Sequence, residues 1–366
     1  MKKKKKMMYL SNVNWSWIKQ RPQFLAEELS IYYDIDVYLK KEYKKSKITG
    51  NKINNNINFK KIFRFPMERY NFISKINKFI VGRQLVKVCN NYDILFLTDP
   101  SYYPWMKASC KNKIIIYDCM DDNAEFPYIK NNLYKLRAYL KAEKMLIKDC
   151  TLLITTSNYL KNVLIDRYKI DELEKKIFVV NNAIDSNTIK IKENKLISNE
   201  KKDKVNIVYI GTIETWMDFD LIIRSLDDCH KLIYNIYGPS GIDIPKHDRL
   251  IWHGPVEHSE IVNIMESADI LVMPFKIIPL ILSVNPVKLY EYISSLKPVI
   301  AVDYEETRKF DEYVYLYKNY DQYMNIIKDI MNGAIKKEKD VEGIKQFLAQ
   351  NTWAERAKFI NDKIER

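Results

Sequence analysis

The amino-acid sequence predicts an α/β protein made of two doubly wound domains. Short strand-like runs recur along the chain, and most are apolar throughout, which is typical of strands buried on both faces of a parallel sheet. Longer segments with helical periodicity separate these runs. A polar, lysine-rich stretch at 190–204 interrupts the pattern, which then restarts. The length of 366 residues exceeds one typical core, so we expect two domains.

Each expected domain has its own set of strands. Before the stretch at 190–204 we expect strands at 7–10, 36–38, 62–65, 94–98, 114–117, 152–155 and 177–180. After it we expect strands at 205–210, 232–237, 250–252, 270–273, 299–302 and 314–317. Ligands of such sheets bind beyond the carboxyl ends of the strands, so the loops that follow the strands should carry the functional residues.

Composition excludes several classes of function. The chain has only eight glycines and contains neither GxGxxG nor GxxxxGK[ST], so a dinucleotide fingerprint and a P-loop are both absent. Its five cysteines form no CxxC pair, which argues against a disulfide framework or a zinc site and favours a reducing cytosol. No RNP, KH, zinc-finger or helix-turn-helix signature is present, so we do not expect nucleic acid as a partner.

The net charge of +13 has two open explanations. One is compositional bias, with lysines as solvated surface; the other is attraction to anionic phosphates or to an anionic inner leaflet. The lysines at 2–6 and a predicted amphipathic helix at 75–87, with a basic face, are the segments that the second explanation would involve. The apolar stretch after the lysines is too short for a signal peptide, and no run is long enough to span a bilayer. We therefore expect a cytoplasmic protein, with peripheral attachment to the inner membrane face as the functional alternative to an ordinary surface helix.

The clearest site signal follows the expected strand at 270–273. Asn285 is a good N-cap and Pro286 suits the first helical position, so a helix begins there with exposed amides that attract an anion. Lys288 lies in the first turn, where a cation opposes the helix dipole, which indicates a bound anion. Glu291 follows at i+3 on nearly the same face and could accept two hydrogen bonds from a ribose diol.

This region resembles the donor-binding region of GT-B glycosyltransferases, especially the retaining members of glycosyltransferase family 4. The matching segments are 269–275, 285–292, 297–300, 236–239, 250–256 and 180–185, together with Gly211 at the end of a strand. At the front of the chain, 15–24 (WSWIKQRPQF) resembles a subgroup that builds bacterial surface polysaccharides, including teichuronic-acid-type transferases. Each motif alone is weak, and their order and spacing carry the resemblance.

The resemblance implies a GT-B fold, with two Rossmann-like domains facing a central cleft. The N-terminal, acceptor-side domain would comprise 1–190 and a C-terminal helix at about 346–366 that crosses back; 200–345 would bind the nucleotide sugar. The implied activity transfers a sugar from a nucleotide-diphosphate sugar to a glycan or lipid-linked acceptor in cell-surface polysaccharide synthesis, with retention. The nucleotide sugar is a substrate, and neither a cofactor nor a metal is expected. A nucleotide-sugar 2-epimerase and a non-catalytic sugar-binding or scaffold partner of the same fold remain as alternatives.

The chain departs from the family pattern at two places. Glu291 matches the second residue of the family's Glu-x7-Glu pair, which holds the nucleotide ribose, but Ser283 stands in place of the first. The family's phosphate-binding Arg and Lys after the first strand of the second domain are also absent, and we expect Lys276 and Lys288 to replace them.

We expect the following site residues. Those for donor binding are Glu291, Asn285, Pro286, Val287, Lys276, Gly211, Thr212, Trp216, Gly238, Gly254, Val256 and Ser283. Those for catalysis are Lys288 and one of Asp118, Asp121 and Asp122, where a carboxylate could act as general base or orient the acceptor hydroxyl, or could simply cap the loop. Those on the acceptor side are Asn12, Asn14, Trp15 and Arg21, the last of which either binds an acceptor phosphate or fixes a helix start.

Overall fold

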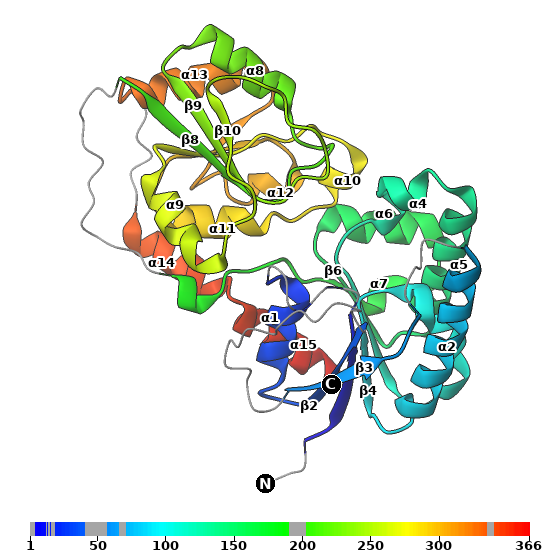
Figure 1. The fold of residues 1–366 in the computed structure, drawn as a ribbon. Helices are drawn as coiled ribbons and strands as arrows, with labels where there is room; N and C mark the ends of the chain where they lie inside the picture. The colour runs from blue at the N-terminus through cyan, green and yellow to red at the C-terminus, as the bar shows by residue number, and fades with distance from the viewer. Residues whose placement is uncertain are drawn as a thin grey trace. The chain divides into compact units, whose positions relative to one another are not determined.

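The chain divides into two compact units (Figure 1). The computed structural model describes residues 4–11, 13, 15, 19–40, 57–65, 71–189, 203–334 and 340–366. Unit 1 comprises Met1–Asn181 and Trp353–Arg366, and unit 2 comprises Asn182–Thr352. The boundary between the N-terminal part of unit 1 and unit 2 therefore follows Asn181, about nine residues before the lysine-rich stretch at 190–204 in which we expected it.

Unit 1 contains a seven-stranded parallel sheet in the order β3-β2-β1-β4-β5-β6-β7. Its strands are β1 (Lys6–Leu10), β2 (Asp34–Lys40), β3 (Ile57–Ile62), β4 (Ile94–Leu97), β5 (Ile114–Cys119), β6 (Leu152–Thr155) and β7 (Ile177–Val179). Strands β2 and β3 are added on one side of β1, and β4 to β7 are added on its other side, so the order of strands switches between β1 and β4. This topological switch point is where the strand-exit loops diverge and where such sheets bind ligands.

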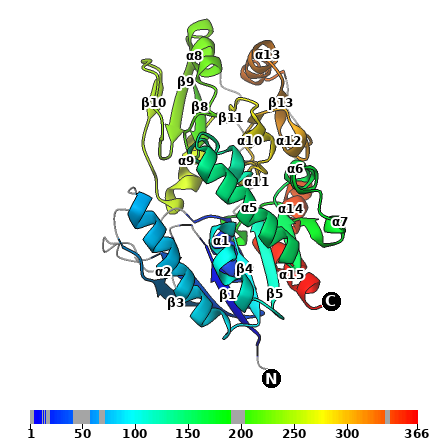
Figure 2. The same cartoon turned by 90° about the vertical axis from the view of Figure 1, so that its right-hand side faces the viewer.

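Helices cover both faces of this sheet (Figure 2). They are α1 (Arg21–Leu29), α2 (Asn71–Cys89), α3 (Tyr103–Met106), α4 (Pro127–Lys130), α5 (Leu133–Asp149), α6 (Asn158–Tyr168), α7 (Leu173–Lys176) and α15 (Trp353–Ile364). Helix α3 contacts both α2 and α5 on one face, while α1 and α15 pack together on the other.

The last helix reaches unit 1 through its buried aromatic residue. Trp353 is buried and stacks on Phe24 of α1, with ring centroids 5.2 Å apart. Arg356 Nε donates to the Asn181 carbonyl oxygen over 3.1 Å, which ties α15 to the end of the N-terminal segment. The single helix expected at 346–366 is in fact two helices, α14 (Val341–Gln350) in unit 2 and α15 in unit 1, because the chain leaves helical geometry at 351–352.

Unit 2 contains a six-stranded parallel sheet in the order β10-β9-β8-β11-β12-β13. Its strands are β8 (Val205–Ile210), β9 (Leu232–Tyr237), β10 (Leu250–Trp252), β11 (Ile270–Met273), β12 (Val299–Val302) and β13 (Tyr315–Tyr317). Its helices are α8 (Phe219–Asp228), α9 (Ile261–Ser267), α10 (Pro279–Leu282), α11 (Val287–Ser294), α12 (Glu305–Arg308), α13 (Tyr320–Met331) and α14. The switch point of this sheet lies between β8 and β11.

One strand differs clearly from its sequence-based prediction. We expected a strand at 62–65, but β3 runs from Ile57 to Ile62. It is the edge strand of its sheet, and only Ile57 and Ile62 are buried in it. Its exposed lysines and asparagine hide the strand from a search for runs that are apolar throughout, because that pattern identifies strands buried on both faces.

Candidate functional site

Three glycines follow three neighbouring strands at the carboxyl edge of the unit 2 sheet. Gly211, Gly238 and Gly254 come after β8, β9 and β10, and the Gly238 amide donates to the Gly254 carbonyl oxygen over 2.8 Å. Gly238 has a φ of +140°, and a Cβ there would lie 1.9 Å from the Gly211 carbonyl oxygen. Only glycine fits at that position. The chain thus places three of its eight glycines where a ligand can approach bare backbone.

The loops after β8 and β11 are paired at the switch point of unit 2. The Lys276 amide donates to the Trp216 carbonyl oxygen over 2.7 Å, and the Asp218 amide donates to the Pro274 carbonyl oxygen over 2.9 Å. Asp218 also caps α8, since its Oδ1 accepts from the Leu221 amide. These bonds give the loop after β8 a defined shape. The loop carries the exposed Thr212, directly after Gly211, and the half-buried Trp216.

The start of α11 differs from its sequence-based prediction. Asn285 does not cap the helix; Pro286 occupies the N-cap position and the helix begins at Val287. The buried Asn285 side chain instead accepts from the Asn182 amide over 2.9 Å and donates to Glu306 Oε2 over 2.8 Å. Asn285 therefore fixes the loop before α11 from within the protein.

Lys288 and Glu291 form an ion pair on the first turns of α11, with Nζ 2.5 Å from Oε2. Lys288 therefore has a partner within the protein, because Glu291 neutralises it across one turn. The Glu291 side chain is 11% exposed and that of Lys288 is 26% exposed. The pair places a cation and a carboxylate together at the carboxyl edge of the sheet. There Lys288 can bind a phosphate and Glu291 can accept from a sugar hydroxyl.

Two other expected donor contacts are engaged elsewhere. Lys276 forms a surface ion pair with Asp220 over 2.8 Å, which raises the pKa of its ammonium group. Ser283 is fully buried, and its hydroxyl donates to the Leu280 carbonyl oxygen over 2.7 Å. Ser283 thus closes a turn of α10 and lacks the carboxylate of the family pattern. Val256 lies half-buried in the exposed segment after β10.

Trp252, at the end of β10, belongs to the matched segment 250–256 but was not among the expected donor-binding residues. Its side chain is 48% exposed, although its indole Nε1 donates to the Gly238 carbonyl oxygen over 2.9 Å. The indole is thereby fixed beside Gly238 and stays partly exposed, as a stacking surface for a base requires. The sequence signal that could have indicated Trp252 is an aromatic residue at the end of a strand, two positions before a glycine.

In unit 1, Asp118 is a buried structural carboxylate. Arg21 donates to it from Nε and Nη2 over 2.9–3.1 Å, and both side chains are almost completely buried. Arg21 Nη1 also donates to the Val180 carbonyl oxygen over 2.9 Å. This pair joins α1, β5 and the end of the β7 segment. Asp118 is therefore not free for catalysis, and Arg21 fixes the start of α1 instead of binding an acceptor phosphate.

Asp122 is also held by an arginine. Arg167 of α6 donates to both of its carboxylate oxygens, and this pairing raises the pKa of the guanidinium group. The same guanidinium lies 3.8 Å from Glu143, a buried carboxylate of α5 that accepts from the hydroxyl groups of Tyr117, Tyr139 and Tyr168. Asp122 is thus part of the internal support of the β5 exit loop.

Asp121 stands apart from these two carboxylates. Its side chain has no hydrogen-bond or ion-pair partner among the described residues, and it follows β5 at the carboxyl edge of the sheet. Burial raises the pKa of Asp121 to about 6. The positive charge of Arg21 lowers this pKa, and the negative charges of Asp118 and Asp122 raise it further. Because the neighbouring aspartates are both saturated by arginines, Asp121 is the carboxylate of this loop that can bind a ligand.

The remaining acceptor-side residues are less informative. Asn12 and Asn14 lie outside the described residues. Trp15 is half-buried and packs edge-on against Tyr9 and Phe59, with centroids 6.3 and 5.7 Å apart, so its ring serves packing. Among the described residues no three His, Cys, Asp or Glu side chains group as a metal site, and no helix is long and apolar enough to cross a membrane.

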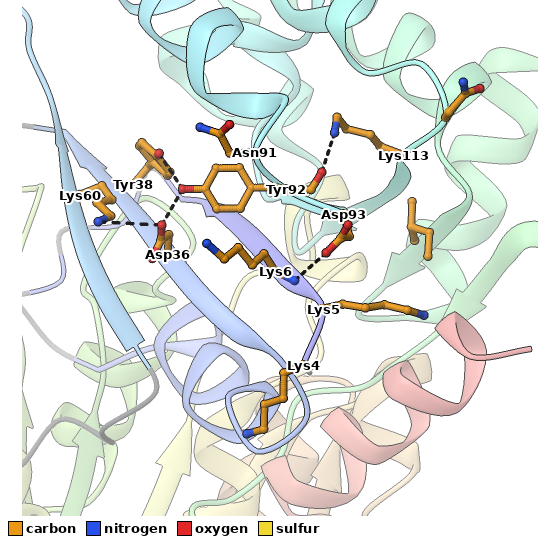
Figure 3. Close-up of a pocket in the computed structure, with 12 residues that line it drawn as sticks. Lys4, Lys5, Lys6, Asp36, Tyr38, Lys60, Asn91, Tyr92, Asp93 and Lys113 are labelled. Carbon is orange, nitrogen blue, oxygen red and sulfur yellow. Dashed lines mark hydrogen bonds and ion pairs between the residues drawn. The ribbon is translucent and has the colours of Figure 1, made fainter. Parts of the chain in front are cut away.

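A pocket of about 1010 Å³ lies at the opposite edge of the unit 1 sheet, near the amino ends of β1, β4 and β5 (Figure 3). Five of its twelve lining residues are lysines, but Lys5 pairs with Glu365 and Lys113 donates to the Tyr92 carbonyl oxygen. The Tyr92 hydroxyl donates to Asp36 within it over 2.6 Å. Because doubly wound sheets bind ligands at their carboxyl edge, we do not assign the main site to this pocket.

Comparisons with known structures agree with this fold. The Anabaena protein Alr3699/HepE, in complex with UDP-glucose, superposes with a TM-score of 0.73 at 12% identity over 99% of both chains. Sucrose-phosphate synthase (tll1590) from Thermosynechococcus elongatus gives a TM-score of 0.73 at 12% identity, over 99% of this chain and 98% of that one. The chain has the GT-B fold that glycosyltransferases of this kind share.

Sequence comparison finds similarity to a curated bacterial protein. The chain is 26% identical over 246 residues to the putative teichuronic acid biosynthesis glycosyltransferase TuaH of Bacillus subtilis (strain 168). The match covers 64% of this chain and 61% of that protein, so it spans less than two thirds of the relative's length. No protein-family model matches the sequence.

Proposed function

We propose that the protein is a glycosyltransferase that moves a sugar from a nucleotide-diphosphate sugar to a glycan or lipid-linked acceptor in cell-surface polysaccharide synthesis. The observation that carries the proposal is the carboxyl edge of unit 2, where three strand-exit glycines and the Lys288–Glu291 pair share the ligand-binding edge of a GT-B fold. The name of the relative TuaH supports the choice of a surface polysaccharide, and the UDP-glucose complex of HepE supports a nucleotide sugar as donor.

The donor chemistry follows from charge and exposure. Glu291 accepts hydrogen bonds from the ribose hydroxyls, and Lys288 turns from Glu291 to the diphosphate when the donor binds. The first-turn amides of α11 add positive potential at the same place. A lysine and a helix N-terminus can stabilise the negative charge that develops on the departing nucleoside diphosphate.

The acceptor hydroxyl donates to Asp121, which orients its oxygen for attack on the anomeric carbon. The family 4 resemblance supports retention of the anomeric configuration as the outcome. A lipid-linked acceptor places the reaction at the inner face of the membrane, to which the net charge of +13 would draw the protein. Detection of glycosylated product, as opposed to an epimerised nucleotide sugar or no product, separates the transferase from an epimerase or a scaffold of this fold.

Replacement of Glu291 by alanine tests the donor site. We expect donor affinity to fall by about 1.5–3 kcal/mol, or roughly 10- to 150-fold in Kd, because a charged hydrogen-bond acceptor is lost. The matched control is Glu355→Ala, which removes an exposed carboxylate from α15. Both variants should retain the wild-type circular dichroism spectrum. Unchanged donor binding in a folded Glu291→Ala protein would remove Glu291 from the site.

Chelation tests whether Lys288 and helix amides suffice for the diphosphate. We expect donor turnover in excess EDTA to equal turnover without it, because this proposal assigns charge neutralisation to the protein. Turnover is measured as release of nucleoside diphosphate after dialysis against EDTA. Complete loss with EDTA and recovery on addition of Mg²⁺ or Mn²⁺ would show that a metal carries the diphosphate charge instead.

A further inference from the structure

Five of the exposed aromatic rings of unit 1 come from neighbouring segments, and we call these five the aromatic surface. They are Phe63, Phe65, Phe72, Phe79 and Trp105, and their exposed fractions range from 43% to 74%. They come from the segment after β3, from α2 and from α3, which contacts α2. Aromatic rings this exposed are costly in water, and several together indicate a binding surface.

The rings after β3 are held in place by α2. Gln84 accepts from the Phe63 amide over 3.0 Å and donates to its carbonyl oxygen over 2.8 Å. Asn77 does the same for Phe65, over 2.6 and 2.8 Å. The two rings lie edge to face with centroids 5.3 Å apart. Two side-chain amides thus fix the backbone in a form that keeps both rings outside.

Trp105 has its own support on α2. A Cβ at Gly82 would lie 2.9 Å from the Trp105 side chain, so this glycine allows the indole to lie directly on the helix. The ring meets the edge of Phe79 with centroids 6.1 Å apart, and the Arg83 guanidinium lies 5.0 Å from the Phe79 centroid. The indole is therefore positioned by packing and still 43% exposed.

The exposed rings are not part of the buried face of α2. The buried positions of α2 are Asn77, Val81, Leu85 and Cys89, spaced four residues apart, with Gly82 beside them. This face packs on the sheet. Phe72 and Phe79, one heptad apart, are left on the outer side together with Arg83.

The charged residues of β3, of the described segment after it and of α2 all have one sign. Residues 57–65 and 71–89 contain seven Lys or Arg and no Asp or Glu. Lys61, Lys78, Arg83 and Lys87 are exposed among them. Aromatic rings flanked by basic side chains are typical of protein surfaces that lie in the headgroup region of a bilayer. An anionic partner is required to complement this charge.

From these observations we infer that the aromatic surface docks on an anionic lipid bilayer, with the rings at the acyl boundary and Lys61, Lys78, Arg83 and Lys87 at the lipid phosphates. The inference rests on the proposed function only in the choice of a membrane as the place of the acceptor. It also revises the expected role of the N-terminal lysines. Lys4 donates to the Ser30 carbonyl oxygen and Lys5 pairs with Glu365, so both are engaged within unit 1.

Vesicle flotation of the full chain tests the inference without any sugar donor. We expect binding to vesicles of phosphatidylcholine mixed with phosphatidylglycerol and none to phosphatidylcholine alone. Phe72→Ser/Phe79→Ser should abolish binding. Lys78→Gln/Arg83→Gln should weaken it about fivefold per charge, since each basic residue near the surface contributes about 1 kcal/mol. Lipids brominated near the acyl boundary should quench tryptophan fluorescence in the wild type, and Trp105→Phe should remove that quenching.

Matched variants control for loss of an exposed apolar or basic residue. Ile31→Ser and Lys358→Gln change exposed residues on the other face of unit 1 and should bind as the wild type does. Wild-type binding by the Phe72/Phe79 variant would overturn the inference, as would equal binding to neutral vesicles. Concentration-dependent dimers that the same variant abolishes, without lipid binding, would assign the surface to a second copy of the chain. Vesicle flotation does not depend on donor turnover, so its result can be read whether the transferase proposal holds or fails.

Discussion

Asp121→Asn is expected to reduce the rate of sugar transfer by about 10²-fold or more while leaving donor affinity unchanged. The two neighbouring aspartates are saturated by Arg21 and Arg167, so Asp121 is the carboxylate of the β5 exit loop that can accept from the acceptor hydroxyl. The rate is measured at saturating donor, with Asp171→Asn on the surface as the matched control. A variant with wild-type turnover would exclude Asp121 from the reaction.

The same residue predicts the acid limb of the pH profile. The ionised carboxylate is a much stronger acceptor for the acceptor hydroxyl than the neutral acid, and burial raises the pKa of Asp121 to about 6. Wild-type turnover should therefore fall as the pH drops through about 6, whereas an ordinary aspartate would lose its charge only near pH 4. In Asp121→Asn the slow residual turnover should lack this limb. A wild-type rate that holds constant down to pH 5 would contradict the assignment.

Asp118→Ala is expected to destabilise unit 1 by about 3–5 kcal/mol, because it leaves the Arg21 guanidinium buried without its carboxylate. Both members of the pair are at least 96% buried, and Arg21 also supports the Val180 carbonyl oxygen. The thermal midpoint should fall by roughly 10 °C. Any loss of turnover should follow from unfolding, and it should recover at lower temperature.

The double variant Arg21→Leu/Asp118→Leu separates charge from packing. It removes both charges together, so it should recover much of the stability lost in Asp118→Ala. Wild-type stability in Asp118→Ala, combined with abolished turnover at every temperature, would instead give Asp118 a direct role in the reaction.

The fold could be predicted from sequence because its strands are buried on both faces. Such strands are continuous apolar runs, and twelve of the expected runs coincide with observed strands. The edge strand β3 has one exposed face and lacks that pattern. The passage of the chain back to unit 1 at Trp353 was predicted from family resemblance, while the break between α14 and α15 was not, because no proline or glycine marks it.

The site could be predicted less completely. Loop positions after strands follow from topology, so the glycines and Asp118, Asp121 and Asp122 could be placed at carboxyl edges in advance. Partners distant in sequence could not be predicted. Asp118 and Arg21 are 97 residues apart, and Asp122 and Arg167 are 45 apart, so only the structure distinguishes the paired aspartates from Asp121. Likewise, Asn285 resembles a helix cap until its contacts with Asn182 and Glu306 are known.

The most direct test of the transferase proposal is to follow a labelled sugar. The purified chain is incubated with a panel of radiolabelled nucleotide-diphosphate sugars and a bacterial membrane extract, and label is counted in the lipid and polysaccharide fractions. We predict that label from at least one donor enters these fractions with equimolar release of nucleoside diphosphate, and that Glu291→Ala and Asp121→Asn greatly reduce it. If no donor binds the folded protein, and no label is transferred from any of them, the chain is not a glycosyltransferase.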